Sequence, residues 1–239
     1  MSKSKSFPID WHAQLPLILS AGLTRILLHG PPDTGKSTTP RKWAEAQGKP
    51  VFQLPCSRDQ GLEELLGQFT LSDGATKYVK GPIPKAMESG GLLICNEFDM
   101  RNPAHDSIFH SLLDDPEICE IILADGSVIK PAPGFMVVCT TNAAPGAFTP
   151  ALLRRWEVKL YCGTAHPEAL KTLPDNQGKF LSNLQGAQKI PELRFEFCVS
   201  SFRAASKLAA HGIEQRAALS VVFGETAAAE LESALASVS

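Results

Sequence analysis

The sequence predicts an α/β fold built on a five-stranded parallel sheet with helices on both faces. Three observations favour it: short apolar runs alternate with helical patterns, the runs lack polar alternation, and a glycine-rich loop joins the first run to a helix. Alternating strands and helices are typical of a parallel sheet. Continuous apolar runs are typical of strands that helices cover on both faces.

Polar, glycine or proline residues follow each of the five apolar runs and end the strand there. The predicted strands are residues 24–29, 50–54, 91–95, 135–140 and 157–162. The segments between them read as helices, the last with apolar residues at helical spacing. The predicted helices are residues 36–47, 61–67, 84–89 and 103–114.

Two segments interrupt this alternation, and each has an Asp-Gly pair between potential strands. Asp-Gly is a strong signal for a tight β-hairpin turn. We therefore predict hairpins over residues 68–79, around Asp73-Gly74, and over residues 117–130, around Asp125-Gly126.

The pattern changes near residue 163, after which alanine- and leucine-rich segments show no clear strand. A final helical stretch is expected over residues 214–235. We predict two domains, an α/β nucleotide-binding domain over residues 1–163 that carries both hairpins and a small helical lid domain over residues 164–239.

Composition bounds the class of protein. The chain has 239 residues, 44% of them hydrophobic and 20% charged, which suffices to bury a core. A formal net charge of -2 gives no overall positive field for nucleic acid or an anionic membrane. The six cysteines include no C-x-x-C pair and are expected to be buried and reduced. The chain shows neither a signal peptide nor a membrane span, so we expect a cytosolic protein.

The loop after the first strand matches the pattern G-x-x-x-x-G-K-[ST] and precedes a helix. In such a loop, backbone N–H groups wrap phosphate oxygens, and the helix N-terminus adds positive potential. Lys36 would contact the β and γ phosphates, and the Ser37 hydroxyl would ligate Mg²⁺. The sequence thus predicts ATP and Mg²⁺ as cofactors. The predicted nucleotide-binding residues are Gly30, Pro31, Pro32, Asp33, Thr34, Gly35, Lys36, Ser37 and Thr38.

The end of the predicted strand 91–95 carries an acidic motif that departs from the usual pattern at one position. Residues 92–97 read Leu-Leu-Ile-Cys-Asn-Glu, so Asn96 stands where an aspartate is usual. Asn96 can accept a hydrogen bond near the metal but brings no charge. Glu97 can orient or deprotonate water. Two interpretations stay open, a hydrolysing site and a site that binds nucleotide with little hydrolysis; Asp99 is a candidate to replace the lost charge.

Taken together, these motifs resemble the AAA+ ATPases, and more narrowly the MoxR-like group with its dynein-related relatives. The resemblance runs from about Leu23 to the C-terminus and places the two hairpins where that group carries inserts. It implies three further site residues. Asn142 ends a segment like sensor 1, Arg155 in residues 151–156 matches the arginine finger that enters a neighbouring subunit, and Arg203 matches sensor 2 on the lid. Arg154 is the alternative finger.

This resemblance implies a homo-oligomeric ring, expected to be a hexamer, that hydrolyses ATP and remodels a protein partner, in this group often one with a von Willebrand A domain. Two alternatives remain from the residues themselves. Asn96 favours a nucleotide-gated assembly protein with little turnover. Lys77, Lys80 and Lys85 near the first insert could contact phosphates in a nucleic-acid motor, although the near-neutral charge makes nucleic acid the less favoured partner.

Overall fold

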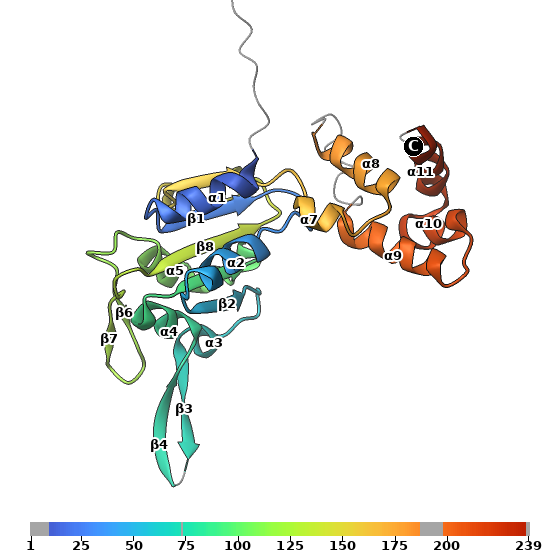
Figure 1. Cartoon of the computed structure of the whole chain (residues 1–239). Coiled ribbons are helices and arrows are strands. Elements are labelled where there is room, and N and C mark those ends of the chain that lie inside the picture. The colour runs from blue at the N-terminus through green and yellow to red at the C-terminus, as the bar shows by residue number, and fades with distance from the viewer. Residues whose placement is uncertain (1–9, 73, 187–197, 238–239) are drawn as a thin grey trace, which may run out of the picture. The chain divides into compact units, whose positions relative to one another are not determined.

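Five parallel strands form the central sheet in a computed structural model that describes residues 10–72, 74–186 and 198–237 (Figure 1). The spatial order is β2-β5-β8-β1-β9, and every neighbouring pair is parallel. The predicted sheet is confirmed, with each strand boundary within one residue of the expected position. The strands are β1 (Arg25–His29), β2 (Val51–Pro55), β5 (Leu92–Asn96), β8 (Met136–Thr141) and β9 (Val158–Tyr161).

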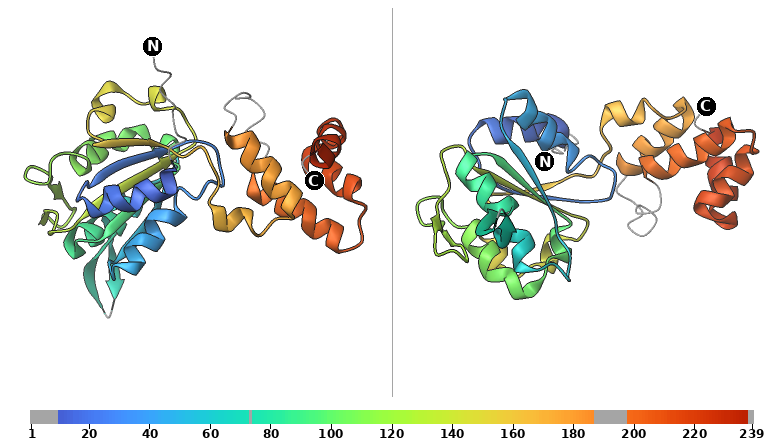
Figure 2. Two further views of the ribbon diagram at one scale, coloured as in Figure 1. Left: turned by 45° about the horizontal axis from the view of Figure 1, so that its top comes forward. Right: turned by 90° about the horizontal axis from the view of Figure 1, so that it is seen from below.

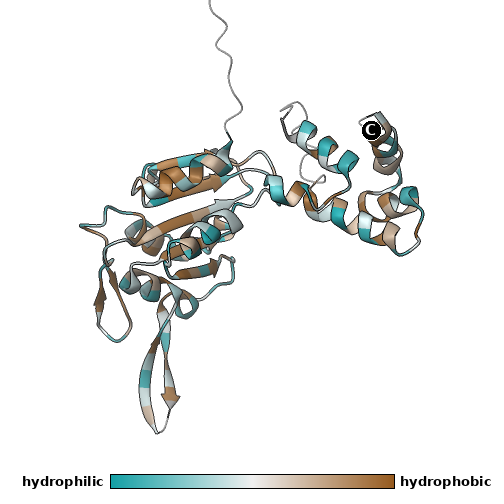
Figure 3. Cartoon of the chain, viewed as in Figure 1, coloured by the Kyte–Doolittle hydropathy of each residue, from teal (hydrophilic) through white to brown (hydrophobic). Residues whose placement is uncertain are grey.

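The central strands are apolar because both faces of the sheet are covered. All six residues of β8 are buried, as are the first four of β5. Figure 3 shows hydrophobic ribbon along β1 and β8, flanked by helices with hydrophilic outer positions. The flanking helices, also visible in Figure 2, are α1 (Trp11–Ser20), α2 (Thr38–Ala46), α3 (Leu62–Leu66), α4 (Pro82–Ser89), α5 (Asp106–Leu112) and α6 (Pro150–Leu153).

Local chemistry shifts several helix boundaries from those expected. Helix α2 begins at Thr38 rather than Lys36, and Pro40 lies in its first turn, where no backbone donor is required. The expected helix over residues 103–114 divides into a 3-10 turn, η2 (Pro103–His105), and α5. The Asn102 side chain caps the start of the turn by accepting the Ala104 N–H at 3.0 Å.

Both predicted hairpins are antiparallel pairs. The first joins β3 (Gly67–Ser72) to β4 (Ala75–Lys80) and extends away from the sheet (Figure 1). Asp73 of its turn lies outside the described residues, whereas Gly74 has the positive φ of +74° that such a turn requires. The second pairs only β6 (Ile121–Ile122) with β7 (Val128–Ile129), so it is shorter than expected.

The described residues after 163 form helices only, as expected. They are α7 (Pro167–Leu170), α8 (Asp175–Gly186), α9 (Val199–Ala210), α10 (Gln215–Phe223) and α11 (Glu225–Ser237). The single helical stretch predicted over residues 214–235 was wrong: it is two helices. Gly224 separates them with a φ of +86°, a conformation that ends a helix.

The described residues divide into two compact units by their internal contacts. The first, here the sheet unit, comprises residues 12–30 and 36–161. The second, here the helical unit, comprises residues 10–11, 31–35, 162–186 and 198–237. The tip of the glycine-rich loop therefore belongs to the helical unit. Within the described part of the chain all six cysteines are buried and none forms a disulfide, and no helix there is long and apolar enough to cross a membrane.

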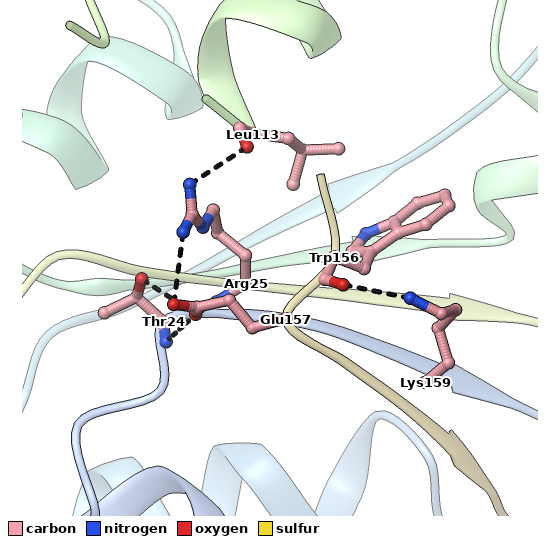
Figure 4. A network of polar contacts seen from close by, with 6 residues as sticks. All are labelled: Thr24, Arg25, Leu113, Trp156, Glu157 and Lys159. Carbon is pink, nitrogen blue, oxygen red and sulfur yellow. Dashed lines mark hydrogen bonds and ion pairs between the residues drawn. The ribbon is translucent and has the colours of Figure 1, made fainter. Parts of the chain in front are cut away.

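A polar cluster fixes the starts of β1 and β9 against each other (Figure 4). One Glu157 carboxylate oxygen accepts the backbone N–H groups of Thr24 at 2.7 Å and Arg25 at 3.0 Å. The other accepts the Arg25 guanidinium at 3.1 Å. Partial burial raises the pKa of Glu157, but these hydrogen bonds and the Arg25 charge outweigh it, so the pKa lies below its usual value of 4.5. The cluster therefore stabilises the sheet with Glu157 ionised.

We expect Glu157→Gln to lower the free energy of unfolding by about 1 to 3 kcal/mol at neutral pH, because hydrogen bonds to a charged group are lost. Since the folded pKa is depressed, this contribution is complete above the unfolded pKa and disappears as the pH falls through the folded one. Denaturant unfolding from about pH 7 to about pH 3 should show the same stability difference between variant and wild type down to about pH 5 and a shrinking difference below it. The exposed Glu117→Gln is the matched control; equal losses in both variants would contradict this role.

Candidate nucleotide-binding site

The glycine-rich loop connects β1 to α2 at the carboxyl edge of the sheet. Gly30 and Gly35 have φ values of +142° and +98°, which residues with side chains rarely adopt. The Lys36 side chain is 8% exposed and turns back across the loop. Its ammonium donates to the Gly30 carbonyl at 2.9 Å and to the Asn142 side-chain oxygen at 2.9 Å. The loop lysine and Asn142, which follows β8, are therefore in direct contact.

Asn96, the last residue of β5, accepts hydrogen bonds from two hydroxyl groups. The Ser37 hydroxyl donates to its side-chain oxygen at 2.5 Å, and the Thr140 hydroxyl donates at 3.3 Å. Thr140 lies on β8, so three separate parts of the chain converge here. Because parallel strands end at the same edge, the loop and the ends of β5 and β8 form one polar site.

The oxygen atoms of this polar site are suited to a divalent cation that is bound by nucleotide phosphates at the same time. Because the Ser37 hydroxyl donates its proton to Asn96, its oxygen keeps lone pairs with which it can ligate a metal ion. Mg²⁺ takes oxygen ligands, retains waters and is commonly held by few protein groups together with phosphates. The described residues contain no cluster of three or more histidine, cysteine or acidic side chains that would hold a metal alone. Asn96 brings no charge to this site, and its side-chain oxygen serves there as a neutral hydrogen-bond acceptor.

Glu97 and Asp99 follow Asn96 at this edge. Glu97 has a φ of +53° and starts the 3-10 turn η1 (Phe98–Met100). Its side chain is exposed and has no hydrogen-bond or ion-pair partner among the described residues. Asp99 instead accepts the Thr141 hydroxyl at 2.5 Å. Asp99 is thus held at the end of β8, next to Asn142, and Glu97 is the acid that is free to contact water.

His29, the last residue of β1, lies beside the loop. Burial lowers its pKa first, and the nearby Lys36 charge lowers it further, so the imidazole is neutral at pH 7. Its ring packs against Tyr161 of β9 with a centroid separation of 5.4 Å. A neutral ring adds no charge to a phosphate site, so the positive charge at this end of the sheet comes from Lys36.

Two site candidates lie in the helical unit. The Asp33 carboxylate accepts the backbone N–H of Ser200 at 2.9 Å. Arg203, one turn further along α9, donates to the Thr172 hydroxyl at 2.9 Å, and its charge acts on the Asp33 carboxyl. Arg203 is exposed. The helical unit therefore brings the loop tip and the sensor 2 candidate into one electrostatic neighbourhood.

The two candidate finger arginines differ in their contacts. The Arg155 guanidinium lies 2.7 Å from the Asp114 carboxylate, and it donates to the carbonyls of His110 at 3.1 Å and Ala151 at 2.9 Å. The neighbouring Arg154 is exposed, and its side chain has no partner among the described residues. Arg155 is thus committed to its own chain, while Arg154 is available to another.

Sequence reasoning missed Thr140 and His29 as parts of this site. Both stand at the carboxyl end of a predicted strand, which is the position where parallel sheets place ligands. That rule, applied to every strand end, would have found them. The contact between Asp33 and Ser200 had no such signal, because the two residues lie 167 positions apart.

Comparisons with known proteins agree with this geometry. A sequence model of the AAA domain, dynein-related subfamily, matches residues 25–156, more than half of the chain. An uncharacterised protein of Staphylococcus saprophyticus is 33% identical over 122 residues, covering 49% of this chain and 46% of the relative. A counterpart from Staphylococcus aureus is 34% identical over the same shares. The chain spans about half the length of these curated relatives.

Two solved structures share the fold. A protein of Cytophaga hutchinsonii, provisionally assigned as an ATPase, aligns with a TM-score of 0.51 and 14% identity, covering 80% of this chain and 57% of that chain. A point mutant of RuvB from Thermotoga maritima aligns with a TM-score of 0.51 and 17% identity, covering 88% and 67%. At these identities the likeness shows the fold. With the family match over residues 25–156, the sheet order and the loop together, the chain belongs to the dynein-related subfamily of the AAA domain family.

Proposed function

We propose that this chain binds Mg-ATP in the loop of residues 30–37 and hydrolyses it. The observation that carries the proposal is the convergence of Lys36 on Asn142 and of Ser37 on Asn96 at one edge of the sheet. Lys36 would turn from the Gly30 carbonyl and the Asn142 side chain to phosphate oxygens, and the Ser37 hydroxyl would ligate Mg²⁺. Held by Ser37, a bound Mg²⁺ would supply positive charge that offsets the negative charge of the phosphates.

Within this proposal Glu97 orients or deprotonates the attacking water, because it is the exposed acid beside Asn96. Asn142 holds that water near the γ phosphate. Arg203 contacts the phosphate from the predicted lid over residues 164–239. An arginine from a neighbouring copy completes the site, and the availability of its side chain favours Arg154 over the Arg155 that the motif suggested.

We further propose a ring assembly, a hexamer as in MoxR-like proteins, that converts ATP turnover into remodelling of a partner protein in the cytosol. AAA family members generally oligomerise, which supports the ring. The von Willebrand A domain partner rests on the resemblance to the MoxR-like group. The chain spans about half of its curated relatives, so recognition of the partner belongs to the proposal as well.

The decisive experiment measures three quantities in one sample: ATP affinity by calorimetry, phosphate release with Mg-ATP, and particle mass with and without ATP. Binding, turnover and ATP-dependent assembly support the proposal. Absence of ATP binding at all concentrations, with a monomer throughout, overturns it. Salt-dependent binding of DNA or RNA would favour the nucleic-acid motor instead. Of its candidate contacts, Lys80 is paired with Glu88, which weakens that alternative.

The second candidate, a nucleotide-gated assembly protein, is favoured by Asn96, whose side-chain oxygen already accepts two hydroxyl groups and carries no charge. We expect Asn96→Asp to raise turnover about tenfold or more, since 1.4 kcal/mol of added metal stabilisation gives that factor. The rate should also saturate at lower Mg²⁺. Asn96→Ala, which removes the acceptor, should lower turnover. An Asn96→Asp rate at or below wild type would show that the neutral residue does not limit hydrolysis.

A further inference from the structure

The first turn of α9 receives no hydrogen bond from its own N-cap side chain. The N-cap residue is Cys198, and its sulfur lies 3.1 Å from the hydroxyls of Ser200 and Ser201 instead of accepting from the backbone. The first N–H groups of a helix need partners outside the helix. A residue from another part of the chain fills this role.

Asp33, in the middle of the phosphate loop, is that residue. Its carboxylate accepts the Ser200 backbone N–H at 2.9 Å. The contact lies within the helical unit, which includes residues 31–35. A negative charge at the start of a helix also interacts favourably with the helix dipole. The loop and the helix are therefore joined by a charged hydrogen bond.

The backbone of Asp33 has a conformation that non-glycine residues rarely adopt. Its φ is +57°, and among the described residues only Glu97 is another non-glycine with positive φ. Such conformations cost energy and persist where the surrounding structure demands them. Partial burial raises the pKa of Asp33, but hydrogen bonds from Ser200 and Cys198 and the Arg203 charge lower it below its usual value, so the carboxylate is ionised.

We infer that Asp33 is a positioning residue that fastens the first turn of α9 to the phosphate loop and thereby fixes the place of Arg203. Arg203 lies three residues after Ser200 on the same helix and is also held by Thr172. A change in the loop on nucleotide binding would then move this turn of α9 with it. The expected effect on turnover rests on the proposed function, because Asp33 acts through Arg203. The fastening of the helix to the loop is independent of that function.

The fastening is tested by amide hydrogen exchange in the nucleotide-free full chain. Asp33→Gly removes the carboxylate without adding strain, because glycine tolerates positive φ. We expect the amides of residues 199–203 to exchange about tenfold faster or more, since a charged hydrogen bond is lost. Asp33→Asn keeps an acceptor and tolerates the same backbone, so it should fall between glycine and wild type. Asp59→Ala, at an exposed aspartate, is the control. Unchanged exchange in Asp33→Gly overturns the inference.

Turnover gives a readout that a merely structural role would not move. Asp33→Gly removes a negative charge beside bound phosphates, so its KM for ATP should not rise, while kcat should fall about fivefold or more because Arg203 loses its fixed place. Asp33→Asn should recover part of kcat. An unchanged kcat with faster exchange overturns the positioning role. If the wild type binds no ATP, the proposed function fails, while the exchange measurements still decide the fastening.

Discussion

Lys36→Ala should abolish ATP-dependent phosphate release and weaken ATP binding by about 100-fold or more. The lysine is 8% exposed and touches both the Gly30 carbonyl and the Asn142 side chain, so its ammonium is already placed within the loop. Its hydrogen bonds to the oxygens of a bound phosphate would be charge-assisted, and a loss of about 2.7 kcal/mol corresponds to a 100-fold change in affinity.

The matched control for this loss is Lys42→Ala. Lys42 is an exposed lysine on α2, six positions after Lys36, and its removal takes the same charge from the helix that follows the loop. Calorimetry with ATP and a phosphate-release assay should leave that variant at wild-type values. Thermal unfolding checks that Lys36→Ala still folds. Turnover by folded Lys36→Ala at the wild-type rate would show that the loop is not the catalytic site.

The parallel sheet could be predicted because the hydrophobicity of each strand reflects how far its two faces are buried. A strand covered on both faces must be apolar throughout, so β5 and β8 appear as continuous runs. The sequence signals for the helices are weaker. Helix α1 was not predicted, because Pro16 lies inside it, although Asp10 precedes it and Gly22 follows it with a φ of +83°. The break at Gly224 was missed because isolated glycines are tolerated inside helical patterns.

Part of the candidate site could likewise be predicted from the sequence, and part could not. The loop, Asn96 at the end of β5 and Asn142 after β8 follow from short motifs, because their spacing is local. Contacts between distant residues do not. Arg155 matched a motif, but its pairing with Asp114, 41 positions earlier, became visible only in three dimensions. The motif points to residues 151–156 for the proposed finger, and the pairing shows which of the two adjacent arginines is engaged within its own chain.

Arg154→Ala is therefore expected to lower kcat by about 10³-fold, the scale of an arginine that stabilises transition-state charge. ATP affinity should change little, because the loop in the same chain is intact. Arg155→Ala should instead lower the free energy of unfolding by about 1 to 3 kcal/mol, because Asp114 loses its charged partner. Steady-state kinetics and denaturant unfolding of both variants separate these effects. Normal stability with lost turnover in Arg155→Ala would reverse the assignment.

A mixing experiment tests whether Arg154 acts on a neighbouring copy. Subunits with Lys36→Ala and subunits with Arg154→Ala are each expected to be inactive alone. Where an Arg154→Ala subunit offers its intact loop to the intact arginine of a Lys36→Ala subunit, a complete site forms. If the two variants mix freely at equal amounts, about a quarter of the interfaces have this arrangement. Recovery of activity on mixing requires a site shared between copies, because no single chain in the mixture carries both Lys36 and Arg154.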